Sequence, residues 1–182
     1  MKCYLTVGAA FVGVLAAFAT TPCSAQNEIV LGLSTAATGA LKSSGETTGI
    51  AVDIAVEEIN AKGGVKGKKI RVVKFDTGSD PKQAVVATNK FAQDDNALAI
   101  IGPFSSGEAA AAFPVGERLG IVQIPNASSA PGLTKGKSYA WRLTEDEEKQ
   151  FVRLLETMKR KGISMKRAEN FYVTDEGIAQ IV

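Results

Sequence analysis

The sequence predicts an α/β fold in which a doubly wound, mostly parallel sheet carries helices on both faces. Short runs rich in β-branched residues alternate with segments whose apolar residues recur at helical spacing, which is the pattern of βαβ units. One of these runs, residues 97–101, contains no polar side chain, as is typical of a strand buried on both faces of a parallel sheet. These two observations place the chain in the α/β class.

The first 25 residues are predicted to be a cleavable secretory signal and not part of the fold. A lysine at position 2 precedes an apolar run over residues 4–19, and small residues then lead to a cleavage site after Ala25. The run is too short for a membrane span, and Pro22 closes it. Because both cysteines, Cys3 and Cys23, lie in this segment, the exported chain is expected to contain neither a disulfide nor a reactive thiol.

Four strands are expected after the signal segment. Each is a short apolar or β-branched run that is followed by a polar or glycine-containing segment. Their expected ranges are 28–33, 69–75, 97–101 and 121–124. Residues 139–143 are a further candidate strand.

Helix signals lie between these strands. Four apolar residues recur at helical spacing in the first interval, and Gly63 and Gly64 supply the end of that helix. The four residues are Ile50, Ile54, Ala55 and Ile59. In the second interval, residues 79–81 combine an N-cap candidate with a proline in the first turn, so a helix should run from there to about Gln93.

A third helix is expected to begin at Ser106. It contains Pro114, which should kink or restart it near Ala112, because proline lacks a backbone N–H and clashes with the preceding turn. An alanine-rich stretch makes up the first turns of this helix.

The composition changes near residue 144. A charged stretch at 144–149 opens a helix that is expected to reach about Lys161, and a strand at 167–174 and a turn at 175–177 follow. We therefore expect more than one structural unit. The expected division is a signal peptide at 1–25, an N-terminal ligand-binding lobe at 26–144 and the truncated beginning of a second α/β lobe at 145–182.

Three polar loops leave the carboxyl ends of expected strands, and ligands of open α/β sheets bind at that edge. These loops are residues 34–44, 103–107 and 126–129. The Ser105 and Ser106 hydroxyls and the positive end of the following helix would suit a carboxylate. Because no Lys or Arg lies between Lys90 and Arg118, neutral donors would hold the anion, which favours reversible binding of a small acid over phosphate chemistry. Taken singly, each serine is as well explained as a loop or capping residue.

Several function classes are disfavoured. The chain has no histidine, and its net charge of +2 does not indicate a nucleic-acid partner. Residues 63–69 and 132–138 resemble phosphate-binding loops, but both depart from the required spacing or residue types. We therefore expect no enzyme activity, no cofactor and no metal site.

Several segments, in order along residues 28–144, resemble the periplasmic solute-binding proteins of branched-chain amino acid ABC transporters and their relatives for other small acids and amides. The matching segments are 55–70, 79–81 with Asp76, 101–107, 114–117, 120–121 and 130–134. The resemblance implies the type I periplasmic binding fold, with two α/β lobes that close on a ligand about a hinge.

The resemblance also assigns site residues. In such proteins the hydroxyls that match Ser106 and Ser129 bind the ligand carboxylate, helped by backbone groups matching Ala127. Ser44 stands where some amino-acid binders carry a large aromatic residue against the ligand side chain, and this difference counts against a branched aliphatic ligand. Asn126 and Ser128 add further polar groups to the same pocket.

The expected function is that of a solute-binding protein exported to the periplasm, which delivers an amino acid or a related small carboxylate or amide to an ABC permease of the inner membrane. With a truncated second lobe, ligand binding is expected to be impaired, because the partner of the ligand's amino group usually lies on that lobe. The alternatives are a nonfunctional fragment, a sensing module with no role in transport, and a small flavodoxin-like enzyme domain.

Overall fold

The four strands expected from the sequence form one parallel sheet. A computed structural model of the protein describes residues 28–163, 171–174 and 177–181. The strands are β1 (Glu28–Thr35), β2 (Lys69–Asp76), β3 (Ala99–Ile101) and β4 (Val122–Ile124), in the spatial order β2-β1-β3-β4. All three pairings are parallel, which confirms the predicted α/β class.

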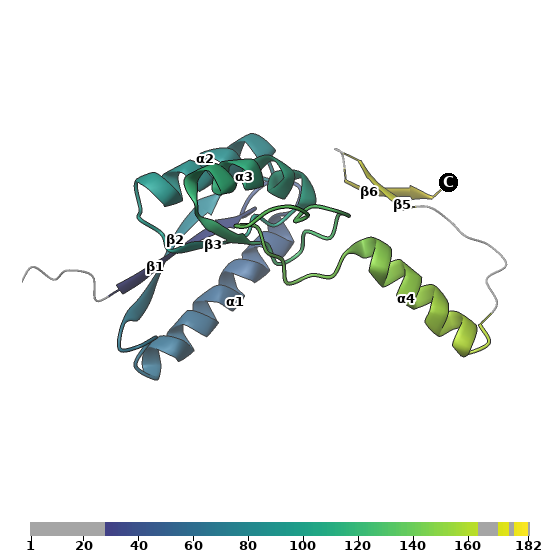
Figure 1. The fold of residues 1–182 in the computed structure, drawn as a ribbon, viewed down its shortest axis with the longest axis horizontal. Coiled ribbons are helices and arrows are strands. Elements are labelled where there is room, and N and C mark those ends of the chain that lie inside the picture. Colours follow the sequence, from purple (N-terminus) through teal and green to yellow (C-terminus); the bar gives the residue numbers. More distant parts are fainter. Residues whose placement is uncertain (1–27, 164–170, 175–176, 182) are drawn as a thin grey trace, which may run out of the picture.

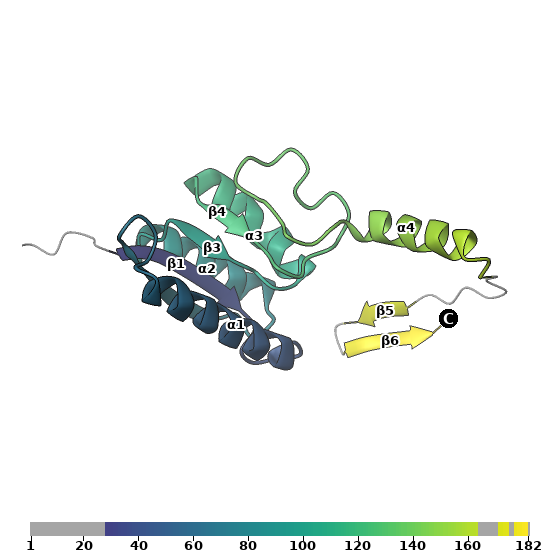
Figure 2. The same cartoon turned by 90° about the horizontal axis from the view of Figure 1, so that it is seen from below.

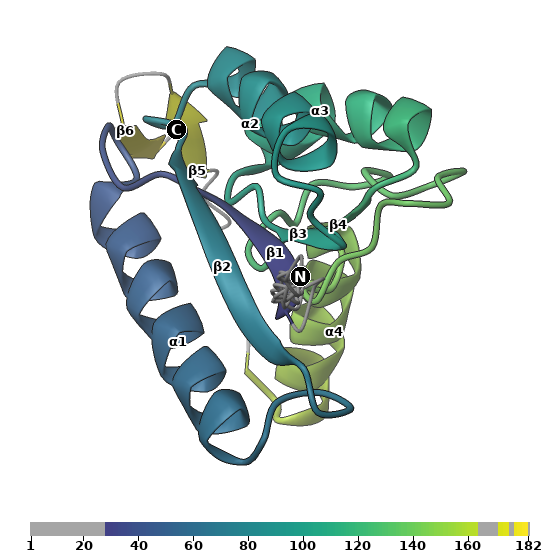
Figure 3. The ribbon, with the colours of Figure 1, turned by 90° about the vertical axis from the view of Figure 1, so that its left-hand side faces the viewer.

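Helices cover both faces of this sheet (Figure 3). Helix α1 (Lys42–Ala61) lies on one face, and α2 (Pro81–Gln93) and α3 (Ser106–Leu119) lie side by side on the other. This is the arrangement that right-handed βαβ crossovers produce when the chain first builds toward β2 and then reverses toward β3 and β4.

The main core lies between the sheet and α2. Phe91 of α2 is fully buried with Ile100 of β3, and its ring meets Phe75 of β2 edge to face with the centroids 6.4 Å apart. Gly32 makes this contact feasible, because a Cβ at that position would lie 2.6 Å from the Phe91 ring. A second cluster packs Ala109 and Phe113 of α3 against Ala140, and Leu133 flanks it.

The helix ends follow local sequence signals. The Asp80 side chain accepts a hydrogen bond from the Lys82 backbone N–H at 2.8 Å, and Pro81 occupies the first helical position of α2, as predicted. Gly120 ends α3 in the left-handed conformation, with φ of 68°.

Of the kink or restart predicted at Pro114, the restart near Ala112 is wrong, because α3 is a single helix from Ser106 to Leu119. Pro114 is exposed, whereas the preceding Ala112 and Phe113 are fully buried. Burial of that face outweighs the single backbone hydrogen bond that proline removes.

Two further expectations need correction. The third strand is shorter than predicted and is not buried on both faces: Leu98 is 68% exposed, while Ala99 and Ile101 are half-buried. Ala99 and Ile101 share their face of the sheet with Leu31 and Leu33, and α1 covers that face only over β1 and β2. Leu98 lies before the strand begins. The loop expected at 34–44 is also shorter, because β1 pairs with β2 through Thr35 and α1 already begins at Lys42.

The candidate strand at 139–143 forms only an isolated bridge. Ala140 pairs with Gln123 of β4, and the Gln123 N–H donates to the Tyr139 carbonyl at 2.8 Å. The Trp141 N–H donates to the Gln123 carbonyl at 3.0 Å. This segment therefore lies along the outer edge of β4 and covers part of it.

The rest of the described chain consists of a helix and a hairpin. Helix α4 (Glu147–Arg160) confirms the expected charged helix and projects away from the four-stranded sheet (Figures 1 and 2). Strands β5 (Phe171–Thr174) and β6 (Gly177–Ile181) pair antiparallel. The predicted signal peptide, the start of the strand expected at 167–174 and part of the turn at 175–177 lie outside the described residues. Among the helices that the structure describes, none has both the length and the apolar character that crossing a membrane requires.

Candidate functional site

Two of the three predicted loops touch at the carboxyl edge of the sheet. Ser106 Oγ, at the start of α3, accepts a hydrogen bond from the Ala130 backbone N–H at 3.2 Å. Ser128, which is fully buried, donates from its hydroxyl to the Phe104 carbonyl at 3.1 Å. The segment after β3 and the segment after β4 therefore form one continuous surface.

The two serines at the start of α3 differ in whether their hydroxyl proton is free to donate to a ligand. Ser105 is the N-cap: its Oγ accepts from the Glu108 N–H at 3.2 Å and donates to Glu108 Oε2 at 2.7 Å. A hydroxyl has one proton to donate, so that of Ser105 is committed to the cap. Ser106 Oγ accepts from Ala130, and its proton has no acceptor among the described residues. Ser106 is thus the better donor to a bound anion.

Ser129 lies where the loop after β4 meets α4. Its hydroxyl donates to Glu147 Oε2 at 3.1 Å, and its carbonyl accepts from the Glu147 N–H at 3.0 Å. Ala127 is half-buried in the same loop, and the preceding Asn126 donates from Nδ2 to Thr48 Oγ1 of α1 at 3.2 Å. The loop is therefore tied both to α1 and to α4.

Ser44 lies in the first turn of α1, with its side chain exposed and with no hydrogen bond to the other predicted site residues. The neighbouring Gly45 is buried, and a Cβ there would lie 2.0 Å from the Ala36 carbonyl oxygen. Close packing at Gly45 therefore fixes where Ser44 stands. Five predicted residues thus lie in two touching loops, and Ser44 lies on a separate element.

Asp76 and Ser79 anchor the loop after β1. Both lie in segments that carry the family resemblance, but neither was predicted to be a site residue. Asp76 Oδ1 accepts from the Thr38 N–H at 3.1 Å and from the Gly78 N–H at 2.9 Å, while Oδ2 accepts from Thr38 Oγ1 at 2.7 Å. Ser79 Oγ accepts from the Leu41 N–H at 3.1 Å. Burial acts to raise the pKa of Asp76, but the hydrogen bonds from Thr38 and Gly78 outweigh it and lower that pKa overall.

A half-buried ion pair joins the loop after β4 to α4. Arg142 Nη2 lies 2.8 Å from Asp146 Oδ2, Arg142 Nη1 donates to the Ala130 carbonyl at 2.8 Å, and the two side chains are only 12% and 14% exposed. Burial acts to raise the pKa of Asp146, but the hydrogen bond from Arg142 and that from the Glu148 N–H outweigh it and lower the pKa. Arg142 is paired with Asp146 and not with Glu147. Among the described residues, Glu147 forms no ion pair with a Lys or Arg side chain.

The sequence contained a weak signal for Glu147, namely the acidic stretch at the start of α4. That signal does not distinguish Glu147 from its acidic neighbours. The side chains of Glu145, Asp146 and Glu147 have different hydrogen-bond or ion-pair partners, and the partners are set by the fold.

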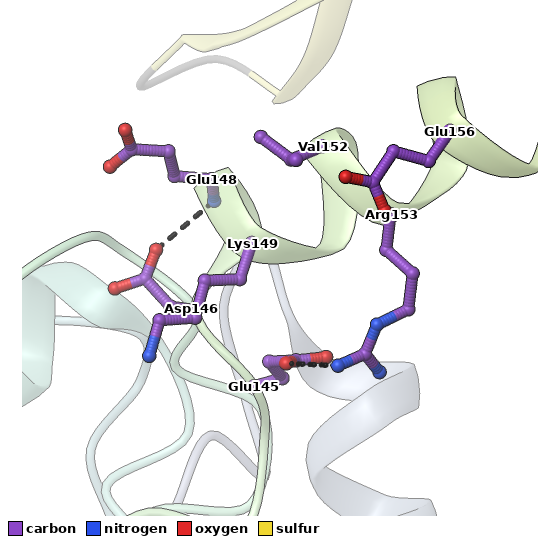
Figure 4. Close-up of a pocket in the computed structure, with 7 residues that line it drawn as sticks. All are labelled: Glu145, Asp146, Glu148, Lys149, Val152, Arg153 and Glu156. Atoms are coloured by element: carbon purple, nitrogen blue, oxygen red, sulfur yellow. Dashed lines mark hydrogen bonds and ion pairs between the residues drawn. The ribbon is translucent and has the colours of Figure 1, made fainter.

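None of the six predicted residues lines either of two cavities in the described chain. One, of about 440 Å³, follows the first turns of α4, where Arg153 pairs with Glu145 at 2.9 Å and the Glu148 N–H donates to Asp146 (Figure 4). The other, of about 580 Å³, lies between α1 and β2, where Lys74 pairs with Asp53 at 2.6 Å. The described residues contain no cluster of three or more His, Cys, Asp or Glu side chains that could hold a metal ion.

Comparisons of this chain with family profiles and with known proteins agree on one family. The profile of the family described as "Periplasmic binding protein" matches residues 28–175. The chain is 36% identical over 126 residues to an amino acid binding protein of Pseudomonas aeruginosa, covering 69% of this chain and 34% of that protein. It is 37% identical over 133 residues to the Leu/Ile/Val-binding protein of Escherichia coli, covering 70% of this chain and 35% of that protein. The chain thus spans about a third of the length of these relatives.

A solved structure shows the same relationship in three dimensions. The branched-chain amino acid transporter substrate binding protein LivJ of Streptococcus pneumoniae, solved in complex with isoleucine, superposes with a TM-score of 0.65 at 32% identity. The superposition covers 66% of this chain and 34% of LivJ. With a family profile that matches most of its length, and with branched-chain amino acid-binding proteins among its relatives, this chain belongs to the periplasmic binding protein family.

Proposed function

We propose that the chain is the first lobe of a solute-binding protein of an ABC importer and that its solute is a zwitterionic α-amino acid. In this proposal residues 1–25 direct export to the periplasm, residues 26–144 form the ligand-binding lobe, and residues 145–182 begin the second lobe. The partner is an ABC permease of the inner membrane, and the chain has no enzyme activity. The observation that carries the choice of solute is the Ser129 hydroxyl, which lies 3.1 Å from the unpaired Glu147 carboxylate.

The ligand carboxylate binds at the start of α3. The proton of the Ser106 hydroxyl is available, and the Ser106 and Gly107 N–H groups lie in the first turn, where an α-helix has no internal acceptors. The positive end of the helix dipole adds to this attraction. The backbone of Ala127 completes the contacts from the neighbouring loop. The Ser129 hydroxyl joins them by turning its single proton from Glu147 Oε2 to the ligand carboxylate, once the ligand ammonium has paired with Glu147.

Glu147 selects the charge type of the ligand. A simple carboxylate placed against Ser129 would meet the Glu147 carboxylate, and two like charges a few ångströms apart repel each other. An α-amino acid carries its ammonium on the carbon next to its carboxylate, so it can contact Ser106 with one group and Glu147 with the other. LivJ, which was solved with isoleucine, is a relative whose ligand has this charge pattern.

Closure of a second lobe completes the site. Small-ligand sites bury most of the surface of their ligand, and the serines of one lobe contact it from one side only. Residues 26–182 alone are therefore expected to bind amino acids much more weakly than a two-lobed protein does.

Titration calorimetry tests the proposal with matched ligand pairs. Residues 26–182 and the full reading frame that contains them are titrated with two pairs that differ only in the amino group. The pairs are L-leucine with 4-methylpentanoate and, because Ser44 counts against a branched aliphatic side chain, L-serine with 3-hydroxypropanoate. We expect tighter binding of the amino acid in the pair that fits the site and a loss of about 10- to 100-fold in its affinity in Glu147→Gln, because a hydrogen bond to a charged group is removed.

Glu148→Gln is the matched control, since it removes the same charge one residue away without a contact to Ser129. Equal binding of the two ligands of each pair, or equal losses in the two variants, would contradict the role of Glu147. Absence of binding of every amino acid by the full reading frame would contradict the proposed function itself.

A further inference from the structure

Glu108 is the one carboxylate that is fully buried in the described part of the chain. It occupies the third position of α3, two residues after Ser106 in the same first turn, and it has 0% exposure. A carboxylate is rarely buried unless its oxygens are well hydrogen-bonded.

Both Glu108 oxygens are engaged, and they reach two different loops. Oε2 accepts from the Ser105 N–H at 3.0 Å and from the Ser105 hydroxyl at 2.7 Å. Oε1 is hydrogen-bonded to the Thr77 hydroxyl, which belongs to the loop after β2. Thr77 is itself tied to the end of β1, because its N–H donates to the Thr35 carbonyl at 2.9 Å.

The bond to Thr77 is not needed to cap the helix. A capping box requires only that the side chain at the third helical position return to the N-cap N–H, and the bond to Ser105 meets that requirement. The second oxygen instead joins α3 to residues 31 positions earlier in the chain. Through Thr77, Glu108 connects the ends of β1 and β2 to the turn that carries Ser105 and Ser106.

We propose that Glu108 is a positioning residue, which holds the Ser105–Ser106 turn in place against the loops after β1 and β2 before a ligand arrives. The expected effect of Glu108 on ligand affinity rests on the proposed function. Donors that are already fixed in a geometry suited to the ligand lose less conformational freedom when it binds. The Ser106 hydroxyl and the first N–H groups of α3 are the donors that Glu108 would fix.

Three variants separate positioning from capping. Thr77→Val removes the bond between the loops and leaves the capping box intact. Glu108→Ala removes both. Glu108→Gln keeps an oxygen for the Ser105 N–H and offers an NH₂ donor to Thr77, so it should restore most of the function.

Thr88→Val is the matched control for the general loss of a buried hydroxyl. Thr88 is also fully buried, but it lies in α2, where it donates to the Ala84 carbonyl at 2.9 Å, far along the chain from the serines.

The first measurement is the affinity of the full reading frame for the amino acid, L-leucine or L-serine, that it binds more tightly, alongside thermal unfolding. Thr77→Val and Glu108→Ala should weaken binding by about tenfold, roughly the effect of one lost buried hydrogen bond. Glu108→Gln should bind within a few-fold of the native protein, and Thr88→Val should lower the melting temperature without weakening binding. Unchanged affinity in Thr77→Val and Glu108→Ala, or an equal loss in Thr88→Val, would overturn the positioning role.

The second measurement needs no ligand. Amide hydrogen exchange at Ala109 and Ala130, whose N–H groups donate to the Ser105 carbonyl and to Ser106 Oγ, should be faster in Thr77→Val and Glu108→Ala than in Thr88→Val. If the native protein binds no amino acid, the proposed function fails while this measurement still decides the inference, and equal exchange in all variants would refute it.

Discussion

At the scale of single residues, the candidate site depends on side chains that tie one loop to another. Asp76 is the clearest case, because its two oxygens accept three hydrogen bonds from residues of the loops after β1 and β2. Such bonds favour the ionised form of the carboxyl group in the folded state. Asp76 therefore couples the shape of the ligand-binding edge to pH.

The first prediction concerns the pH dependence of stability. The pKa of Asp76 is lower in the folded chain than in the unfolded chain, so its contribution to stability is present above about pH 4 and is lost as pH falls below that. Asp76→Asn should lower the free energy of unfolding at pH 7 by no more than about 1 kcal/mol, because the side chain is solvent-exposed. At pH 3 the difference should shrink.

Denaturant unfolding of the native chain and of Asp76→Asn at both pH values measures this effect. Thr38→Val removes one donor and should reproduce part of the loss at pH 7. A difference between native and Asp76→Asn chains that grows on acidification would have the wrong sign for the proposed cause.

At the scale of secondary-structure elements, the outer edge of the sheet is protected by a side chain of the neighbouring helix. β2 is an edge strand, and Asn60 of α1 accepts from the Ile70 N–H at 2.7 Å and donates to the Ile70 carbonyl at 2.8 Å. The amide therefore occupies backbone groups that would otherwise be free to pair with another chain.

The second prediction tests this edge contact. Asn60→Ala should lower the free energy of unfolding by about 1–2 kcal/mol, because two hydrogen bonds to the backbone are lost. Asn60→Asp should be at least as harmful, because a carboxylate would face the Ile70 carbonyl. Asn89→Ala is the control: its amide makes one hydrogen bond within its own helix, to Val85. Similar losses at positions 60 and 89 would argue against a special role for the edge contact.

At the scale of the whole molecule, the helices cover the sheet unevenly. Leu33, Ile101 and Ile124 lie in register across β1, β3 and β4, yet only Leu33 is fully buried, because α1 covers only the β1 and β2 side of this face. Trp141, next to β4, is 62% exposed. Helix α4 adds three exposed apolar side chains, Phe151, Val152 and Leu154, and has no buried residue.

The third prediction follows from this exposed apolar surface. Residues 26–182 should self-associate in a concentration-dependent way, since contiguous apolar surface favours association. Phe151→Ser combined with Leu154→Ser should weaken self-association by about tenfold or more and leave the melting temperature nearly unchanged. Sedimentation velocity and thermal unfolding measure the two effects. A large fall in melting temperature would mean that α4 packs against the rest of the chain in solution.

Much of the fold could be predicted from the sequence because its signals are local. The N-cap and proline at Asp80 and Pro81 act within one helical turn, and the β-branched runs of β1 and β2 form strands close to the expected ranges. The family could be inferred for a related reason, since it is carried by motifs each contained in one short segment. The roles of the predicted serines in binding stay a prediction.

What the tertiary structure alone decided depends on residues far apart in the chain. The uninterrupted passage of α3 through Pro114 and the partial exposure of Ala99 and Ile101 reflect which faces the helices cover, and no local pattern contains that information. The same holds for the contacts Thr77–Glu108, Ser129–Glu147 and Asp76–Thr38, which join residues 18 to 38 positions apart. Propensity and capping act over three or four neighbouring residues, whereas the partner of a buried or bridging side chain is set by the order in which the strands assemble.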